Sequence, residues 1–120
     1  MNDDVQLVPS SWFHQEFLTL PVHLQERVAK RLQTLEQKGW SASTSSRDIV
    51  ALNDGIWELR VLSRGAAFRV LFFLDPRERS RVVVLTTCAS KSSIKHVMTA
   101  EITRAKMRRA QWLQQEEAGR

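Results

Sequence analysis

The sequence predicts a single α+β domain in which two N-terminal helices precede a three- to four-stranded antiparallel sheet and one helix follows it. Three observations predict this order: apolar residues at helical spacing before residue 39, alternating apolar residues from residue 56 to residue 88, and a helix-capping threonine before a basic C-terminal segment. A length of 120 residues suits one hydrophobic core, so we expect one domain over residues 1–120.

Two helices are predicted before the sheet. Ser10 or Ser11 can cap a short helix over residues 12–18, because a serine oxygen can accept a free N–H of the first turn. Pro21 suits the first turn of the second helix, where its missing N–H would have no partner anyway. Gly39 supplies the left-handed residue that ends this helix. The apolar stripe of the second helix consists of Leu24, Val28, Leu32 and Leu35.

The strands follow a polar segment, SASTSSRD at residues 41–48, which we expect to be a loop. Residues 52–74 are typical of a β-hairpin that turns at residues 63–66. Asp75 and Pro76 open a second turn, which leads into a β-branched strand at residues 81–88. A short strand at residues 49–52, or at residues 5–8, could extend the sheet.

The hairpin has two different faces if Arg60 lies opposite Arg69. One face is then apolar and should be the core face, where we expect the helices to pack; the other carries the arginines and is the candidate site. Like charges directly opposite each other destabilise a sheet, so we expect an anion to offset them. The alternative is that each arginine pairs with a carboxylate of the chain, such as Glu58. The predicted core face comprises Trp57, Leu59, Phe68, Val70, Phe72, Val83 and Leu85.

The third strand should add to the arginine face. If Phe73 pairs with Val82, Thr86 falls beside Arg69 and Cys88 lies further along the same face. Thr86 and Cys88 are also explained by strand packing alone. An irregular segment is expected over residues 89–98, and it carries Lys91, Lys95 and His96.

Thr99 can cap the last helix, with Glu101 in its first turn. Ile102, Ala105, Trp112 and Leu113 give this helix a packing side. The rest of the helix is strongly basic, which favours contact with RNA but is also typical of a solvated face. The basic residues are Arg104, Lys106, Arg108 and Arg109.

Composition narrows the class of partner. The net charge of +5 and the pI of about 10.1 favour a polyanion, most commonly nucleic acid. The one cysteine, Cys88, excludes an intrachain disulfide and fits a reducing cytoplasm. No basic segment followed by an apolar run opens the chain, and no apolar stretch approaches the roughly 20 residues that span a bilayer, so neither a secretory signal nor a membrane partner is expected. The histidines, Cys88 and the carboxylates form no metal-site pattern, and we expect no cofactor.

The cation cluster suits cleavage of RNA through its own 2′-OH, which needs a base, an acid and stabilisation of a pentacoordinate phosphate. Arg60 and Arg69 present planar forks that match phosphate oxygens. His96 titrates near neutral pH, and a lysine among other cations can lose its proton near neutrality. Lys91 and Lys95 are equally typical of a solvated loop, and His96 of a helix start.

Four segments carry a family resemblance: LNDGIWELR at residues 52–60, FRVLFF at 68–73, RVVVLTT at 81–87 and EITRAKMRRAQWL at 101–113. Over nearly its whole length the chain resembles the RelE/HigB-like toxins of bacterial type II toxin–antitoxin pairs, in particular their phage-derived HigB-like branch. The resemblance implies a RelE-like fold and a metal-independent mRNA endoribonuclease, often ribosome-dependent, which inhibits translation. It also implies a small antitoxin partner, usually with a helix-turn-helix, and contact with operator DNA only through that antitoxin.

Position by position, the resemblance implies that Arg60, Arg69 and Lys91 belong to the site. Relatives have a His-Gly-aromatic step and two lysines where this chain has residues 86–91, TTCASK, and the chain contains no tyrosine. We therefore predict Arg60, Arg69, Lys91 and His96 as catalytic residues, and Lys95, Arg104 and Arg108 as RNA-binding residues. The alternatives are a catalytically weak RNA-binding module and an antitoxin-dependent co-repressor with the same fold.

Overall fold

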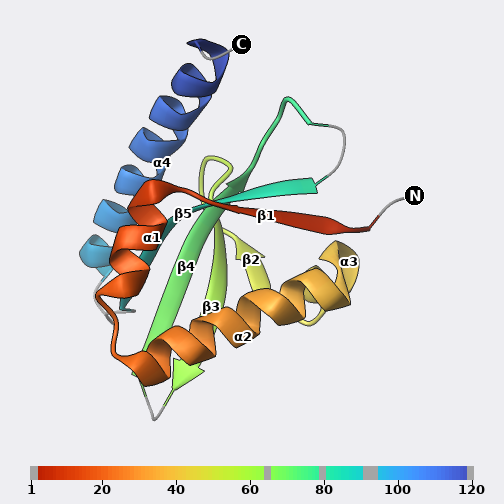
Figure 1. Ribbon diagram of the computed structural model, residues 1–120, viewed down its shortest axis with the longest axis vertical. Helices are drawn as coiled ribbons and strands as arrows, with labels where there is room; N and C mark the ends of the chain where they lie inside the picture. The colour runs from red at the N-terminus through yellow and green to blue at the C-terminus, as the bar shows by residue number, and fades with distance from the viewer. Residues whose placement is uncertain (1–2, 64–65, 79–80, 91–94, 119–120) are drawn as a thin grey trace.

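The computed structural model describes the backbone of residues 3–63, 66–78, 81–90 and 95–118, and side chains over residues 3–62, 67–78, 81–88 and 99–115. Lys91 therefore lies outside the described residues. The elements in chain order are β1 (Val5–Pro9), α1 (Ser11–Leu18), α2 (Val22–Lys38), α3 (Trp40–Ser45), β2 (Ile49–Ala51), β3 (Trp57–Ser63), β4 (Ala66–Leu74), β5 (Arg81–Ser90) and α4 (Lys95–Ala118) (Figure 1).

The sheet has five strands in the order β1-β5-β4-β3-β2. β1 runs parallel to β5 and the other pairs are antiparallel, so the sheet is mixed. The prediction of three to four antiparallel strands was therefore wrong, because both candidate short strands join the sheet, at opposite edges. A parallel pair needs a long crossover connection, and local periodicity carries no sign of which distant strand closes it.

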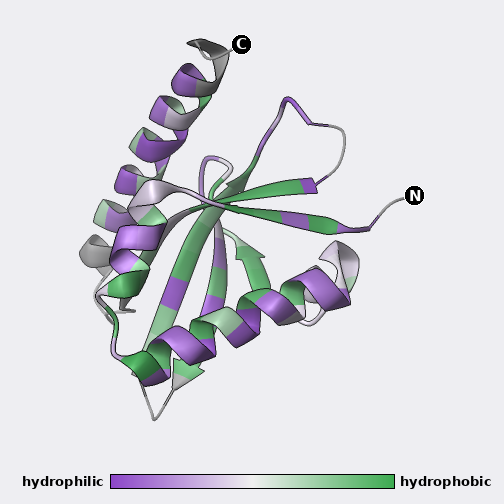
Figure 2. Cartoon of the chain, viewed as in Figure 1, coloured by the Kyte–Doolittle hydropathy of each residue, from purple (hydrophilic) through white to green (hydrophobic). Residues whose placement is uncertain are grey.

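The two predicted helices, α1 and α2, pack on one face of the sheet, as the sequence predicts, and α3, which was not predicted, joins them there. α2 is amphipathic, and Figure 2 shows its apolar and polar bands alternating along its length. Its buried side chains meet Leu59, Val61, Val70 and Phe72 of the hairpin. This confirms the predicted core face. The buried helical members of this cluster are Phe13, Val28, Leu35 and Trp40.

α4 covers the opposite face of the sheet. Ala105 of α4 is buried against Ile56, Leu71 and Phe73 in a second, smaller apolar cluster. The prediction that all helices share one face and leave the other open was wrong. The arginine face is itself partly apolar, and exposing Leu71 and Phe73 would keep two large side chains in water. The α4 side chains that pack beside this cluster are Ile102, Trp112 and Leu113.

The N-terminal helix boundaries follow local capping chemistry. Ser10 caps α1, since its Oγ accepts the N–H of Phe13 at 3.1 Å. Gly39 ends α2 with φ of +88°, as predicted. The expected loop after Gly39 instead begins with α3, because the buried Trp40 packs edge-on against Trp57 at 4.7 Å between ring centroids. Asp3 holds the start of α3 by accepting the N–H of Ser41 at 2.9 Å.

The register of the hairpin is the predicted one, with Arg60 paired to Arg69. The register of β5 differs from the prediction. Phe73 pairs with Val84, and a bulge opposite Leu71 and Phe72 then shifts the pairing by one residue. As a result Ala89 lies opposite Arg69. Cys88 consequently belongs to the α2-side core rather than to the arginine face. A one-residue bulge reverses the face of every later residue, which alternation alone does not reveal.

α4 begins at Lys95, before the predicted cap at Thr99. The segment expected to be irregular, residues 89–98, contains the end of β5 and the first turn of α4. Over the residues that the structure describes, no helix has both the length and the apolar character required to cross a bilayer.

Candidate functional site

Arg60 and Arg69 face each other across β3 and β4 on the side that α4 covers. Their environments differ sharply. The side chain of Arg60 is 44% exposed, whereas that of Arg69 is 1% exposed. Arg60 can therefore meet a ligand directly, but Arg69 is closed off by the protein in this conformation.

Each guanidinium has a carboxylate of the chain beside it. Arg60 Nε lies 3.3 Å from Glu58 Oε1, and Arg69 Nε lies 3.5 Å from Glu101 Oε2. Glu58 stands on β3 two residues before Arg60, and Glu101 comes from α4. These two carboxylates offset the repulsion between the opposed arginines. In this conformation the structure thus shows the alternative in which each arginine pairs with a carboxylate of the chain, rather than with a bound anion.

The charges beneath α4 are incompletely satisfied. Among the described residues, Glu58 Oε2, Arg69 Nη1 and Glu101 Oε2 are buried without a hydrogen-bond partner. Burial raises the pKa of Glu101, and the opposing effects of Arg69 and Arg104 are smaller. Buried polar groups normally have partners, so this contact between α4 and the sheet is less favourable than an apolar one.

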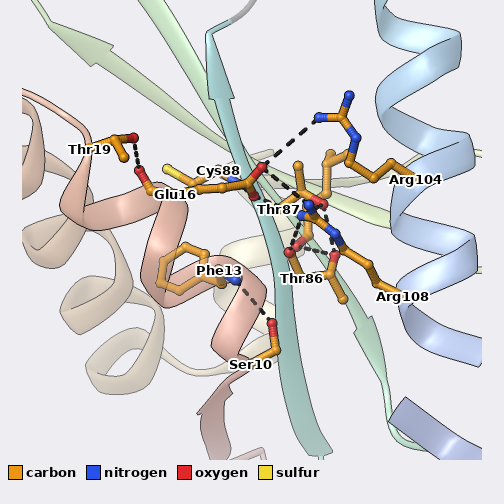
Figure 3. Close-up of polar contacts among 10 residues, drawn as sticks. Ser10, Phe13, Glu16, Thr19, Thr86, Thr87, Cys88, Arg104 and Arg108 are labelled. Atoms are coloured by element: carbon orange, nitrogen blue, oxygen red, sulfur yellow. Dashed lines mark hydrogen bonds and ion pairs between the residues drawn. The ribbon is translucent and has the colours of Figure 1, made fainter. Parts of the chain in front are cut away.

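A second group of charges fixes α4 to the edge of β5 (Figure 3). Arg108 Nη1 donates to Glu16 Oε1 and to the carbonyl oxygen of Thr86, both at 2.8 Å. Glu16 Oε1 also accepts the backbone N–H of Cys88 at 3.2 Å. β1 pairs with β5 only up to Leu85, so the two side chains occupy hydrogen-bonding positions that a neighbouring strand would otherwise use.

This arrangement separates the two predicted RNA-binding arginines of α4. Arg108 is 16% exposed and is held within the fold by Glu16 and Thr86. Arg104 is 52% exposed, and its Nη1 is 4.0 Å from Glu16 Oε2. Arg104 is thus free to meet a solvent-borne ligand, whereas Arg108 first serves to attach α4.

The remaining predicted site residues lie near the start of α4. The backbones of Lys95 and His96 form its first turn, and their side chains lie outside the described part of the chain. The structure therefore brings together Arg60 and Arg69, and adds Glu101 as a partner that sequence reasoning had assigned only to the first turn of a helix. Glu101 lies one helical turn before Ala105, a residue of the predicted packing side, and this spacing was the signal that Glu101 faces the sheet.

The described part of the chain offers no thiolate nucleophile and no metal-binding group of three. Cys88 is buried, and burial, with a smaller contribution from Glu16, raises the pKa of its thiol to about 12. Among the described residues, His, Cys, Asp and Glu side chains do not gather in groups of three or more that could hold a metal ion.

A mixed five-stranded sheet with α1–α3 on one face and α4 on the other gives an α+β fold similar to that of RelE toxins. Residues 15–110 match the model of the family described as phage derived protein Gp49-like (DUF891). The chain therefore belongs to this family, a RelE/HigB-type toxin family, which confirms the resemblance drawn from its motifs.

The fold is similar to a chain in the crystal structure of the toxin-antitoxin complex RelBE2 from Mycobacterium tuberculosis. The TM-score is 0.52 at 16% sequence identity, and the match covers 72% of this chain and 96% of that chain. No curated protein matches the chain.

Proposed function

We propose that the chain is the toxin of a bacterial type II toxin–antitoxin pair and acts as a ribosome-dependent mRNA endoribonuclease that inhibits translation. Membership of a RelE/HigB-type toxin family supports the class. The observation that carries the activity is the pair of opposed arginines, Arg60 and Arg69, on the face closed by α4. Two adjacent forks of this kind can bind non-bridging oxygens of one phosphate.

The proposed reaction is a transfer within the RNA strand. The 2′-oxygen attacks phosphorus and forms the new P–O bond, while the bond to the 5′-oxygen breaks and that oxygen takes up a proton. Arg60 and Arg69 stabilise the extra charge of the pentacoordinate phosphate. His96 or Lys95 removes the 2′-proton or supplies the proton to the leaving oxygen, and Lys91 assists the charge or acts as proton donor. The reaction requires neither a metal ion nor a cofactor.

Arg69 can take this role only if α4 withdraws from it. In the closed conformation Glu101 occupies the position beside Arg69 that a phosphate would take. The buried atoms without partners beneath α4 lower the cost of exchanging the carboxylate for a phosphate. We propose that the first turns of α4 move when RNA binds, while Arg104, on the exposed side of α4, holds the RNA backbone.

The proposed partners follow from the family. A small helix-turn-helix antitoxin would neutralise the chain, and operator DNA would be contacted only through that antitoxin. The toxin-antitoxin complex with a similar fold supports a protein partner of this class. Message and ribosome are the proposed RNA partners.

Expression of the chain in bacteria tests the proposal. The parent chain should arrest growth, and Arg69→Ala and Arg60→Gln should abolish the arrest. Lys30→Gln is the matched control and should remain toxic. It removes an exposed cation of α2, and α2 packs on the face of the sheet opposite to the arginine face. If Arg69→Ala arrests growth as strongly as the parent, Arg69 is not catalytic.

The closed pair of Arg69 and Glu101 favours a second candidate function in which the chain does not cleave RNA efficiently. The chain would then be a catalytically weak RNA-binding module or an antitoxin-dependent co-repressor with the same fold. In that case α4 stays closed and RNA meets only the exposed cations. An RNA-cleavage assay with and without ribosomes separates the two functions, since a module binds RNA and yields no cleavage products.

A further inference from the structure

A second group of arginines lines a cavity of about 320 Å³ at the edge of β3, away from the contact between Arg69 and α4. Arg27 and Arg31 reach it from α2, Arg47 from the turn before β2, and Arg60 from β3. The cavity is lined by Arg27, Arg31, Arg47, Asp48, Arg60 and Leu62.

The edge of β3 fixes two of these arginines in place. β2 pairs with β3 only over residues 57–59 in the described part of the chain, so the later carbonyl oxygens of β3 are available to side chains. Arg27 donates to the carbonyl oxygen of Leu62 from Nε and Nη2, at 3.3 and 3.0 Å. Arg31 Nε donates to the carbonyl oxygen of Arg60 at 3.3 Å. These bonds hold the guanidinium groups at the cavity before a ligand arrives, which lowers the entropy lost on binding.

The cavity carries an excess of positive charge. Its one carboxylate, Asp48, lies 3.1 Å from Arg31 Nη2 and 2.9 Å from Lys38 Nζ. Four arginines therefore line the cavity against one carboxylate that is already paired. Arg47 has φ of +62°, and its side chain makes no ion pair or hydrogen bond with the other described residues. A charged side chain with no partner of its own can bind an anion without first breaking a contact.

A second, mostly apolar hollow of about 190 Å³ adjoins the arginine cavity, and Arg47 lines both. Trp57 forms part of its wall. The Trp57 ring is held by Trp40 and by Phe72, at centroid distances of 4.7 and 6.3 Å. The other residues of this hollow are Thr44, Ile49, Val50 and Ala51.

We propose that the two hollows bind one nucleotide of a single-stranded RNA, with its phosphate on the arginines and its base against Trp57. A cationic cavity beside an aromatic wall is the combination that single-stranded nucleic acids use. An acidic peptide would need only the first hollow. Because Arg60 lines the cavity and also faces Arg69, a strand bound here leads toward the proposed cleavage site. The choice of RNA as ligand rests on the proposed function.

Equilibrium binding of a fluorescent octaribonucleotide with 2′-O-methyl groups tests the site, because the blocked 2′-oxygen prevents cleavage and separates binding from catalysis. Arg47→Asn removes the charge and keeps a residue that tolerates positive φ. Ala51→Phe fills the apolar hollow from its exposed rim. Lys30→Gln is the control, an exposed cation on α2 that lines neither hollow.

Arg47→Asn should weaken binding about three- to tenfold and reduce the slope of log K against log salt by about 0.7. Ala51→Phe should weaken binding by a similar factor, about tenfold at most, and leave the salt slope unchanged. The inference is overturned if neither variant changes the affinity while both remain folded, or if the parent does not bind. It is also overturned if octaglutamate binds as tightly as the RNA and responds only to Arg47→Asn. RNA binding without any cleavage of unmodified RNA, even when ribosomes are present, would contradict the proposed function and leave this site standing.

Discussion

The two faces of the sheet bury different kinds of side chain. The face under α1, α2 and α3 is an apolar core in which Val28, Val61, Val70 and Phe72 have no exposed surface. The face under α4 has a smaller apolar cluster and also encloses Glu58, Arg69 and Glu101. Of the seven buried side-chain polar atoms without a hydrogen-bond partner among the described residues, five lie on the α4 side.

This difference in buried side chains indicates that the two faces have different roles in the protein. A face that only has to fold gains most from dense apolar packing, and the α2 side has it. A face that buries charges without satisfying them loses stability, and such sites are common where a protein binds or reacts. The α4 side is therefore the part of the domain that we expect to open, and the α2 side the part that holds the fold.

The largest effect should come from truncating one large side chain on each face. Phe72→Ala should lower the free energy of unfolding by about 4 kcal/mol, because it leaves a cavity in the main core. Phe73→Ala removes the same ring from the smaller cluster, and should chiefly free α4. Hydrogen exchange should show faster exchange throughout the sheet for the first variant and mainly in α4 for the second. Equal global destabilisation by both would remove the distinction between the faces.

Removing the carboxylate that faces Arg69 should have the next largest effect. Glu101→Ala leaves a buried guanidinium without its partner and should cost about 2–3 kcal/mol, measured by denaturant unfolding. The double variant Arg69→Met with Glu101→Leu replaces both charges by apolar groups. It should be as stable as the parent or more stable, since the pair has not satisfied its hydrogen bonds. A double variant that is less stable than the parent would show that the pair stabilises the fold.

The attachment of α4 to the edge of β5 should contribute less to the free energy of unfolding. Arg108→Gln loses charge-assisted hydrogen bonds to Glu16 and Thr86, and should cost about 1–3 kcal/mol. Arg109→Gln, the next residue on the same helix, alters an exposed contact with Asp54 and should change stability by about 0.5 kcal/mol or less. Faster amide exchange at Cys88 in the first variant alone would confirm that Glu16 and Arg108 protect this edge. Identical exchange in both would contradict it.

The smallest effects should depend on pH and should differ in sign. Lys38, with Arg31 and Ser46, lowers the pKa of Asp48 from 3.8 to about 2. The contribution of ionised Asp48 to stability is therefore complete above about pH 4 and is lost as the pH falls from about 4 to about 2. Burial raises the pKa of Glu101 above 4.5, so stability is lost as pH rises from 4.5 through the raised value.

Unfolding curves from pH 2 to pH 8 measure both effects. Asp48→Asn should remove about 1–2 kcal/mol at pH 7 and flatten the acid limb. Glu101→Gln should flatten the decline above pH 4.5. An unchanged acid limb in Asp48→Asn, or an unchanged decline in Glu101→Gln, would show that the group does not control stability in that range.

The sequence predicted the parts of the fold that depend on neighbouring residues. The cap at Ser10, the end of α2 at Gly39 and the pairing of Arg60 with Arg69 each follow from a pattern within a few residues or across one tight turn. The apolar face of the hairpin followed from simple alternation, and the structure places that face against α1, α2 and α3.

The features that the sequence did not predict depend on distant contacts. α3 needs Asp3 at its start, and β1 finds its parallel partner after most of the chain has intervened. The bulge in β5 moves Cys88 into the core, although the alternation of its neighbours is ordinary. For the same reason the pairing of Arg69 with Glu101 was not predicted, since it joins β4 to a helix whose docking face was not known.

RNA cleavage by the arginine face is tested most directly by mapping 5′ ends on cellular mRNA after induction of the chain alone. The parent should create new 5′ ends within minutes. The double variant Arg69→Met with Glu101→Leu, which we expect to fold, should create none, because it lacks the second guanidinium. Absence of new ends with the parent, or the same ends with the folded double variant, would contradict the claim that the arginine face under α4 cleaves RNA.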